Sequence, residues 1–218
     1  MAKALKVGVL GTGDVGQVLG AGLAGLGHDV KIGSRERGNA KADAWVKKTG
    51  ARASAGTFAE AAQFGDVIVL ATLWSGTENA IKQAAPQSFS GKVVIDATNP
   101  LKFTEGAPPS LALGHTDSGG EQVQRWLPSA RVVKAFNIVG NAHMVKPTFP
   151  GGPPTMFIAG NDADAKKTVT GILTEFGWET LDIGGIQGAR LLEPMCMLWV
   201  NYGIQSGSWN HAFKLLRK

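Results

Sequence analysis

The chain has 218 residues, of which 44% are hydrophobic and 18% charged, a balance typical of a globular protein with a sizeable core. Its formal net charge is +5, but the lysines and arginines are dispersed and form no dense basic tract, so we expect no nucleic-acid partner. The single cysteine, Cys196, excludes an intrachain disulfide. The apolar stretch 5–27 contains Asp14 and many glycines, which argues against a membrane span or a signal sequence, and we expect a cytoplasmic location.

The first predicted elements are a strand, a tight turn and a helix within residues 6–27. A short apolar run breaks into Gly11-x-Gly13-x-x-Gly16 and continues with apolar residues at helical spacing. In this motif the first glycine allows the turn, the second lets a pyrophosphate approach bare backbone, and the third lets the helix pack against the strand. The helix N-terminus then offers free N–H groups to the phosphates. The pattern predicts a nicotinamide cofactor, and the alternative is an ordinary strand-to-helix turn without a ligand.

The second predicted strand, 29–32, is followed by Ser34, Arg35, Glu36 and Arg37. NAD sites place an acidic residue at this point, where it accepts hydrogen bonds from the ribose 2′-hydroxyl. A serine and two arginines instead suit a 2′-phosphate, because the hydroxyl donates a hydrogen bond and a guanidinium binds phosphate through two N–H groups. We therefore expect NADP(H). The alternative is a basic loop that is only solvated. Glu36 departs from the pattern, since its carboxylate either faces the phosphate or pairs with an arginine.

Strand and helix patterns alternate over the following hundred residues, which is typical of a parallel sheet covered by helices on both faces. Thr57-x-x-Glu60 and Ser75-x-x-Glu78 are capping boxes that predict the starts of two helices. The expected fold is α/β, a Rossmann fold with a doubly wound parallel sheet. Its further strands are expected at 51–54, 66–72, 92–98 and 131–136.

The C-terminal part of the chain carries a different pattern. A loop rich in proline and glycine, 146–154, precedes one more strand–helix–strand unit within 155–183, and the tail 190–218 reads as helical. We therefore expect an NADP-binding domain over 1–143 and a small C-terminal extension over 144–218.

The tail contains Trp199, Tyr202 and Trp209, at spacings of 3 and 7 residues that place them on one helical stripe. Core packing is the commonest reason for such a stripe. A homodimer contact and a wall of the substrate pocket are the alternatives.

Few residues suggest acid–base or nucleophilic catalysis, and the sequence has no metal-ligand spacing and no nucleophile motif. Cys196 lies in an apolar helical segment, where an inert buried thiol is expected. Lys134, in the middle of a predicted strand, is expected to be structural. His143, just beyond that strand, is the one histidine that we place near the nicotinamide, with a structural role favoured over proton donation.

Several motifs together resemble the coenzyme F420-dependent NADP oxidoreductases, and equally the cytoplasmic reductase domain of the STEAP metalloreductases. The similarity covers nearly the whole chain, and so is far more specific than the glycines alone. The motifs are the glycine turn, Gly33-Ser-Arg35, Ala71-Thr-Leu-Trp74, Asp96-Ala-Thr-Asn-Pro100 and Lys134-Ala-Phe-Asn137.

The resemblance implies an enzyme that transfers hydride between NADP(H) and a deazaflavin or flavin-like ring stacked on the nicotinamide. It implies that the acceptor pocket is built from the loop 139–143 and the C-terminal helix. The cofactor-binding residues that it implies are Gly11, Thr12, Gly13, Asp14, Val15 and Gly16 at the pyrophosphate, Ser34, Arg35 and Arg37 at the 2′-phosphate, Thr72, Leu73 and Trp74 toward the nicotinamide, and Asn99, Phe136 and Asn137 at the ends of later strands.

Two alternatives stay open at this point. One is an NADPH-dependent flavin or ferric reductase, and the other is a redox sensor that binds NADPH without turnover. Imine reductases and hydroxyacid-type dehydrogenases append a large helical domain, for which the roughly 75 residues after the sheet leave too little chain. We expect a small-molecule acceptor, a homodimer, and no membrane partner.

Overall fold

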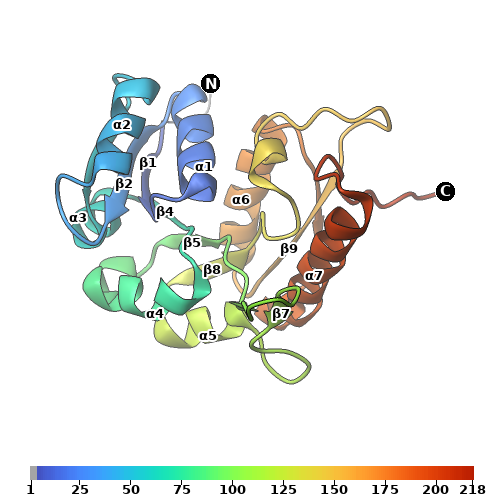
Figure 1. Ribbon diagram of the computed structural model, residues 1–218. Helices are drawn as coiled ribbons and strands as arrows, with labels where there is room; N and C mark the ends of the chain where they lie inside the picture. The colour runs from blue at the N-terminus through green and yellow to red at the C-terminus, as the bar shows by residue number, and fades with distance from the viewer. Residues whose placement is uncertain (1–3) are drawn as a thin grey trace. The chain divides into compact units, whose positions relative to one another are not determined.

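The computed structural model describes residues 4–218, which form two compact units (Figure 1). The first unit comprises the chain up to Ile95 together with Gln124–Arg131. The second unit comprises Asp96–Val123 and Val132–Lys218. Whether residues 1–143 form a domain separate from 144–218 stays a prediction.

The first unit contains a sheet with the strand order β3-β2-β1-β4-β5, in which the β2–β3, β1–β2 and β1–β4 pairs are parallel. The register pairs Leu10 at the end of β1 with Gly33 of β2 and with Leu70 at the end of β4. The carboxyl ends of three neighbouring strands therefore lie together, as they do in nucleotide-binding sheets. The strands are β1 (Lys6–Leu10), β2 (Asp29–Ser34), β3 (Ala53–Thr57), β4 (Val67–Leu70) and β5 (Val93–Asp96).

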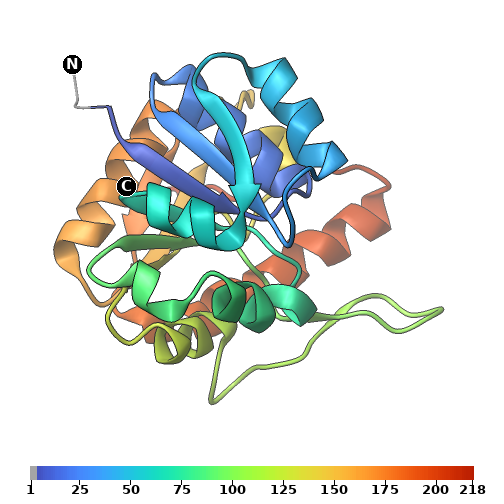
Figure 2. The same ribbon diagram turned by 90° about the vertical axis from the view of Figure 1, so that its left-hand side faces the viewer.

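Helices cover both faces of this sheet (Figure 2). A Cβ on Gly8 would lie 2.1 Å from Ala61 O of α3, whereas a Cβ on Gly16 of α1 would contact Val9. Successive strand residues point to opposite faces, so α1 and α3 lie on opposite sides. Trp45 of α2 packs over α1, where its Nε1 donates to Gln17 O at 2.9 Å. The helices are α1 (Asp14–Gly25), α2 (Ala40–Thr49), α3 (Phe58–Phe64), α4 (Trp74–Gln83) and the 3-10 helix η1 (Pro86–Phe89).

The second unit contains β8 (Arg131–Lys134), β9 (Thr155–Gly160) and β10 (Glu179–Asp182), in that order. β9 and β10 are parallel and flank α6 (Ala163–Glu175), which confirms the expected strand–helix–strand unit. β8 and β9 are antiparallel, in contrast to the all-parallel sheet that we expected. The segment between them contains only the short 3-10 helix η2 (Asn141–His143) and no α-helix of the kind that usually forms the crossover between parallel neighbours.

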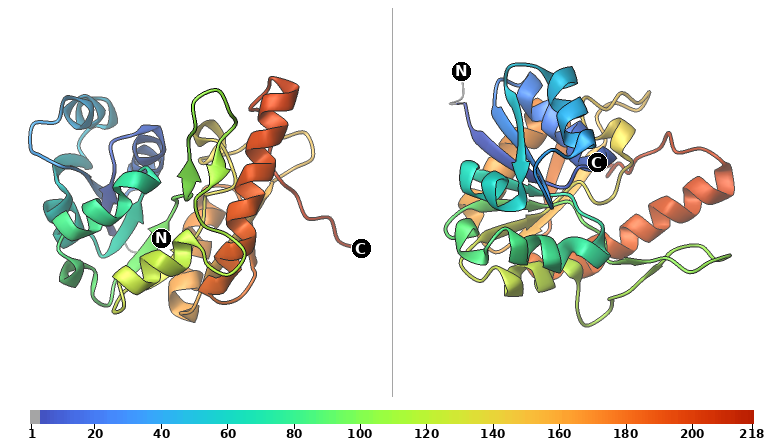
Figure 3. Two further views of the ribbon diagram at one scale, coloured as in Figure 1. Left: turned by 60° about the horizontal axis from the view of Figure 1, so that its bottom comes forward. Right: turned by 60° about the vertical axis from the view of Figure 1, so that its left-hand side comes forward.

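The remaining elements of the second unit surround its long C-terminal helix. A short hairpin, β6 (Leu101–Lys102) with β7 (Ser110–Leu111), lies beside α7 (Ala189–Ser206), as Figure 3 shows. The 3-10 helix η3 (Ile186–Gly188) precedes α7 directly. Helix α5 (Gly119–Trp126) has residues in both units.

The α/β Rossmann class is confirmed, as is the capping box at Thr57 and Glu60, whose two reciprocal hydrogen bonds are both present. The capping box predicted at Ser75 and Glu78 is wrong, because α4 begins one residue before Ser75 and has Leu73 as its N-cap. The helical tail is also shorter than expected. Gly207 adopts a left-handed conformation, with φ of 64°, and ends α7 there. Trp209 consequently lies outside the helix, yet its ring still packs on Trp199 at 5.2 Å between centroids.

The buried core is dominated by aliphatic side chains of the strands, as expected for parallel strands covered on both faces. Within residues 4–218, no helix is both long enough and apolar enough to cross a membrane.

Candidate nucleotide-binding site

The turn between β1 and α1 requires glycine at two positions for steric reasons. Gly11 has φ of +126°, and a Cβ there would lie 2.3 Å from Ala71 O. A Cβ on Gly16 would lie 2.1 Å from Gly11 O. Contacts below 3 Å are not tolerated against backbone, so the chain packs on itself at both points. The turn is a tightly built strand-to-helix connection of the kind that the motif predicts.

Gly13 is different, because a Cβ at this position would meet nothing within 4 Å. It is the N-cap of α1, has extended backbone (φ −75°, ψ 176°), and α1 has no side-chain cap within the described chain. The first N–H groups of the helix, beginning with Asp14 and Val15, therefore need an acceptor. Thr12 O accepts a hydrogen bond from Gln17 Nε2 at 2.9 Å, which holds the turn in place. An open, uncapped helix N-terminus is suited to an anion such as a pyrophosphate.

The loop after β2 presents one arginine without an internal partner. Ser34 is buried, and its hydroxyl donates to Glu36 O. Arg37 forms an ion pair with Glu60 rather than with Glu36. The Thr57 backbone N–H and then Arg37 lower the pKa of Glu60 below its usual value. Arg35 is exposed, and it forms no ion pair with any residue in 4–218. It is the cation of this loop that is available to a ligand.

The segment after β4 lies directly against the glycine turn, because the would-be Cβ of Gly11 contacts both Ala71 and Thr72. Leu73 is 75% exposed. Trp74 is half-buried and stacks on Trp126 with ring centroids 5.5 Å apart. The first unit thus gathers the glycine turn, the loop after β2 and residues 72–74 at the carboxyl ends of β1, β2 and β4.

Three predicted cofactor residues, Asn99, Phe136 and Asn137, lie in the second unit, and the two asparagines hydrogen-bond to each other. Asn99 Nδ2 donates to Asn137 O at 2.8 Å, and Asn137 Nδ2 donates to Asn99 Oδ1 at 3.0 Å and to Leu192 O at 2.9 Å. Phe136 is 1% exposed and packs edge-on against Phe176, so its ring belongs to the core. Its φ of 64° is unusual for a residue with a side chain.

Next to these amides, Lys134 lies in a buried ionic cluster. Its Nζ is 2.9 Å from Asp96 Oδ2 and 2.8 Å from Glu193 Oε1, and all three side chains are at most 1% exposed. The Glu193 carboxylate also accepts the N–H groups of Gly119 and Gly120, each at 2.9 Å. Burial alone lowers the pKa of Lys134, but the two carboxylates outweigh it and raise the pKa above its ordinary value. Lys134 is structural, as expected.

Cys196 is buried, as expected. Burial raises the pKa of its thiol to about 12, so the thiol is protonated at neutral pH. A protonated buried thiol is a poor nucleophile.

His143 contacts the C-terminal tail. Its Nε2 is 3.2 Å from Asn210 Oδ1, and its ring lies 4.9 Å from that of Phe149. Among the described residues, no group of histidine, cysteine and carboxylate side chains is arranged to hold a metal ion.

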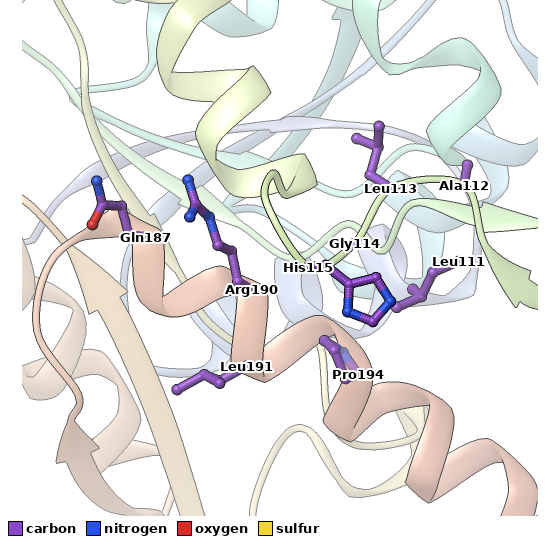
Figure 4. Close-up of a pocket in the computed structure, with 9 residues that line it drawn as sticks. All are labelled: Leu111, Ala112, Leu113, Gly114, His115, Gln187, Arg190, Leu191 and Pro194. Carbon is purple, nitrogen blue, oxygen red and sulfur yellow. The ribbon is translucent and has the colours of Figure 1, made fainter.

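A groove of about 730 Å³ runs along α7 in the second unit (Figure 4). One wall is the loop 111–115, and the other consists of Gln187, Arg190, Leu191 and Pro194. Arg190 is held by Glu121 through two hydrogen bonds of 2.8 and 2.6 Å. The resemblance implied an acceptor pocket built from the loop 139–143 and the C-terminal helix. This groove is lined by the C-terminal helix but not by that loop, so the location of the acceptor pocket stays a prediction. The loop 111–115 carries no motif that would have identified it from the sequence.

Comparison with known proteins gives a consistent result. Residues 6–100 match the model of the family described as NADP oxidoreductase, coenzyme F420-dependent. The F420-dependent NADP reductase of Methanothermobacter marburgensis is 29% identical over 221 residues, covering 97% of this chain and 98% of that protein. The crystal structure of an Arthrobacter sp. FB24 protein, assigned as an F420-dependent NADP reductase, is 35% identical, with a TM-score of 0.92 over 98% of this chain and 100% of the other.

A second kind of relative is the rat metalloreductase STEAP3 (Rattus norvegicus), which is 30% identical over 193 residues. The match covers 88% of this chain but only 36% of that protein, so the chain spans about a third of its length.

Proposed function

Since the chain belongs to the coenzyme F420-dependent NADP oxidoreductase family, and is thus an NADP-dependent oxidoreductase, we propose that it transfers hydride between NADP(H) and a deazaflavin acceptor. The observation that carries the cofactor part is the open N-terminus of α1, which has no side-chain cap within the described chain. Beside it lies a loop whose Arg35 forms no ion pair within residues 4–218, and no acidic residue stands at the end of β2. The similarity to named F420-dependent reductases over almost the full chain supports the acceptor.

We assign the cofactor contacts in the first unit by their chemistry. The N–H groups of Gly13, Asp14 and Val15 bind the pyrophosphate, and Arg35 binds the 2′-phosphate. Arg37 contributes charge to the same site while it remains paired with Glu60.

Asn99 and Asn137, which the family resemblance assigns to the cofactor, stay proposed cofactor residues. The two side-chain amides have four N–H hydrogens in total. Three of them are already donated, two within the pair and one to Leu192 O. The pair is therefore rigid, which suits a positioning role.

Hydride transfer between two flat rings requires that the reacting carbons approach to roughly 3–3.5 Å and that water is excluded. The acceptor takes two electrons with the hydride and a proton from solvent, and so no protein acid is needed. This fits a chain in which His143 bonds to Asn210 rather than standing free as a proton donor.

The cofactor assignment is tested with Arg35→Ala. An arginine–phosphate bond contributes about 1.5–3 kcal/mol, so NADPH should bind about 10- to 150-fold more weakly while NADH binding is unchanged. The readout is a fluorescence titration with both nucleotides. Arg52→Ala is the matched control, because Arg52 is also exposed but pairs with Asp29 at the opposite end of β2. Equal losses for NADPH and NADH would show that the 2′-phosphate is held elsewhere.

The similarity to the metalloreductase keeps a second candidate open, an NADPH-dependent flavin or ferric reductase. It differs from the first only in the acceptor. A redox sensor without turnover would bind NADPH but would not oxidise it, whichever acceptor is offered.

We also propose a homodimer that forms through α7. Its face carries Leu191, Leu198 and Tyr202, which are 65%, 58% and 56% exposed and lie at helical spacing. A stripe of large exposed apolar side chains is typical of an interface. Light scattering on the purified protein should give twice the chain mass, and Leu198→Glu should halve it. A wild-type protein that is monomeric at micromolar concentration would contradict the dimer.

A further inference from the structure

Behind the segment 72–74 lies a hydroxyl that the sequence did not single out. Thr77, in the first turn of α4, is fully buried. Its Oγ1 lies 3.0 Å from Leu73 O and 2.9 Å from Thr72 Oγ1. All three residues belong to the first unit and follow the carboxyl end of β4.

The two contacts determine the direction of both hydrogen bonds. A backbone carbonyl only accepts, so the single hydroxyl hydrogen of Thr77 is donated to Leu73 O. In the hydrogen bond between the two threonines, the Thr72 hydroxyl must therefore donate its hydrogen to Thr77 Oγ1. Thr72 has no further hydrogen to donate, and what it offers to a ligand is the lone pairs of its oxygen.

Thr72 lies at the edge of the proposed cofactor site. Its backbone N is 3.3 Å from the position of a Cβ on Gly11, so it adjoins the first glycine of the phosphate turn. The side chain is half-buried rather than enclosed. An oxygen that can only accept will favour a ligand group that donates, and it will disfavour one that only accepts.

We propose that Thr77 is a positioning residue that makes Thr72 a dedicated hydrogen-bond acceptor for a donor on the nicotinamide half of NADP(H). The donor is a ribose hydroxyl or the carboxamide NH₂, which share this chemistry. This inference rests on the proposed function, because it assumes that the dinucleotide occupies the site.

The test is a double-mutant cycle on Thr72→Val and Thr77→Val, with NADP⁺ affinity measured by calorimetry. Valine keeps the shape of threonine and replaces its hydroxyl with a methyl group, which forms no hydrogen bond. A neutral hydrogen bond contributes about 0.5–1.5 kcal/mol, so each single variant should bind NADP⁺ about 2- to 12-fold more weakly. Because Thr77 acts through Thr72, the double variant should be no weaker than Thr72→Val alone. Thr77→Ser, which keeps the hydroxyl, should bind like the wild type.

Fragments and analogues of the cofactor serve as internal controls. Adenosine 2′,5′-bisphosphate lacks the nicotinamide half and should bind all variants equally. If Thr72→Val weakens 2′-phospho-ADP-ribose as much as NADP⁺, the donor is a ribose hydroxyl. If it weakens NADP⁺ but neither that fragment nor the 3-acetylpyridine analogue of NADP⁺, which has no carboxamide NH₂, the donor is the carboxamide.

Additive losses in the double variant, unchanged NADP⁺ binding in Thr72→Val, or equal weakening of adenosine 2′,5′-bisphosphate would each overturn the inference. A wild-type protein that does not bind NADP⁺ at all would instead overturn the proposed function. The two failures are therefore distinguishable. Should Thr77→Val not fold, Thr72→Val with the same ligands still decides whether the Thr72 oxygen accepts from the cofactor.

Discussion

Replacing Lys134 with methionine is expected to lower the free energy of unfolding by about 3–5 kcal/mol, the usual cost of removing one partner from a buried ion pair. The Lys134 ammonium is fully buried between Asp96 and Glu193, at 2.9 and 2.8 Å. Without it, two carboxylates face each other in the core with no compensating charge. Urea denaturation followed by tryptophan fluorescence measures the loss.

The pH dependence of this effect follows from the raised pKa of Lys134. A group whose pKa is higher in the folded state stabilises fully below its unfolded pKa, about 10.4 for lysine, and loses that contribution as the pH rises through the folded value. The difference between wild type and Lys134→Met should therefore persist at neutral pH and shrink only in strongly alkaline solution.

Two further variants separate charge from packing. Lys134→Met combined with Asp96→Asn and Glu193→Gln removes the charges together and should recover much of the stability. Lys92→Met is the matched lysine control, because the Lys92 ammonium donates to Ala62 O at 2.7 Å and the carboxylate that acts on it, Asp66, is exposed. A Lys134→Met protein as stable as Lys92→Met would contradict the account of the cluster.

Replacing Gly13 with alanine is expected to abolish most NADPH binding while leaving the fold intact. A Cβ at this position meets nothing within 4 Å, and a φ of −75° is allowed for alanine. Losing glycine at the N-cap should cost no more than about 1 kcal/mol in stability. The added methyl group occupies the space that the pyrophosphate needs beside the helix N-terminus, and we expect affinity to fall at least tenfold in a fluorescence titration.

Gly25→Ala provides the control within the same helix. Gly25 also has nothing within 4 Å of a Cβ, but it is the last residue of α1, far along the helix from the phosphate turn. Alanine there should leave NADPH binding unchanged and stabilise the protein by up to about 1 kcal/mol. If Gly13→Ala binds NADPH as tightly as Gly25→Ala does, the turn does not hold the pyrophosphate.

The glycine turn was the most predictable part of the site, because its requirements are local. A Cβ added to Gly11 or Gly16 would lie within 2.3 Å of a backbone oxygen, whereas a Cβ added to Gly13 would meet open space, as the spacing of the motif implies. The start of α3 was predictable for the same reason, since Thr57 and Glu60 cap it through bonds only three residues apart.

Other features depend on tertiary structure and gave no local signal. Glu193 forms an ion pair with Lys134 although it lies 59 positions later in the chain, and no sequence pattern near either residue predicts this pairing. The capping box predicted at Ser75 is wrong because α4 already begins at Trp74 with Leu73 as its N-cap, so Ser75 lies inside the first turn. The end of α7 was missed because Gly207 stops the helix while Trp209 still reaches Trp199, which preserves the aromatic contact without the helical spacing.

Hydride transfer between NADPH and a deazaflavin can be measured as anaerobic NADPH oxidation, followed at the nicotinamide absorbance. Coenzyme F420, a free flavin and a ferric chelate are offered in parallel, with NADH as the control donor. We expect rapid oxidation of NADPH with coenzyme F420, and little oxidation with NADH as donor or with the other acceptors. NADPH oxidation only with the flavin or the ferric chelate, or saturable NADPH binding without oxidation by any acceptor, would rule out a deazaflavin reductase.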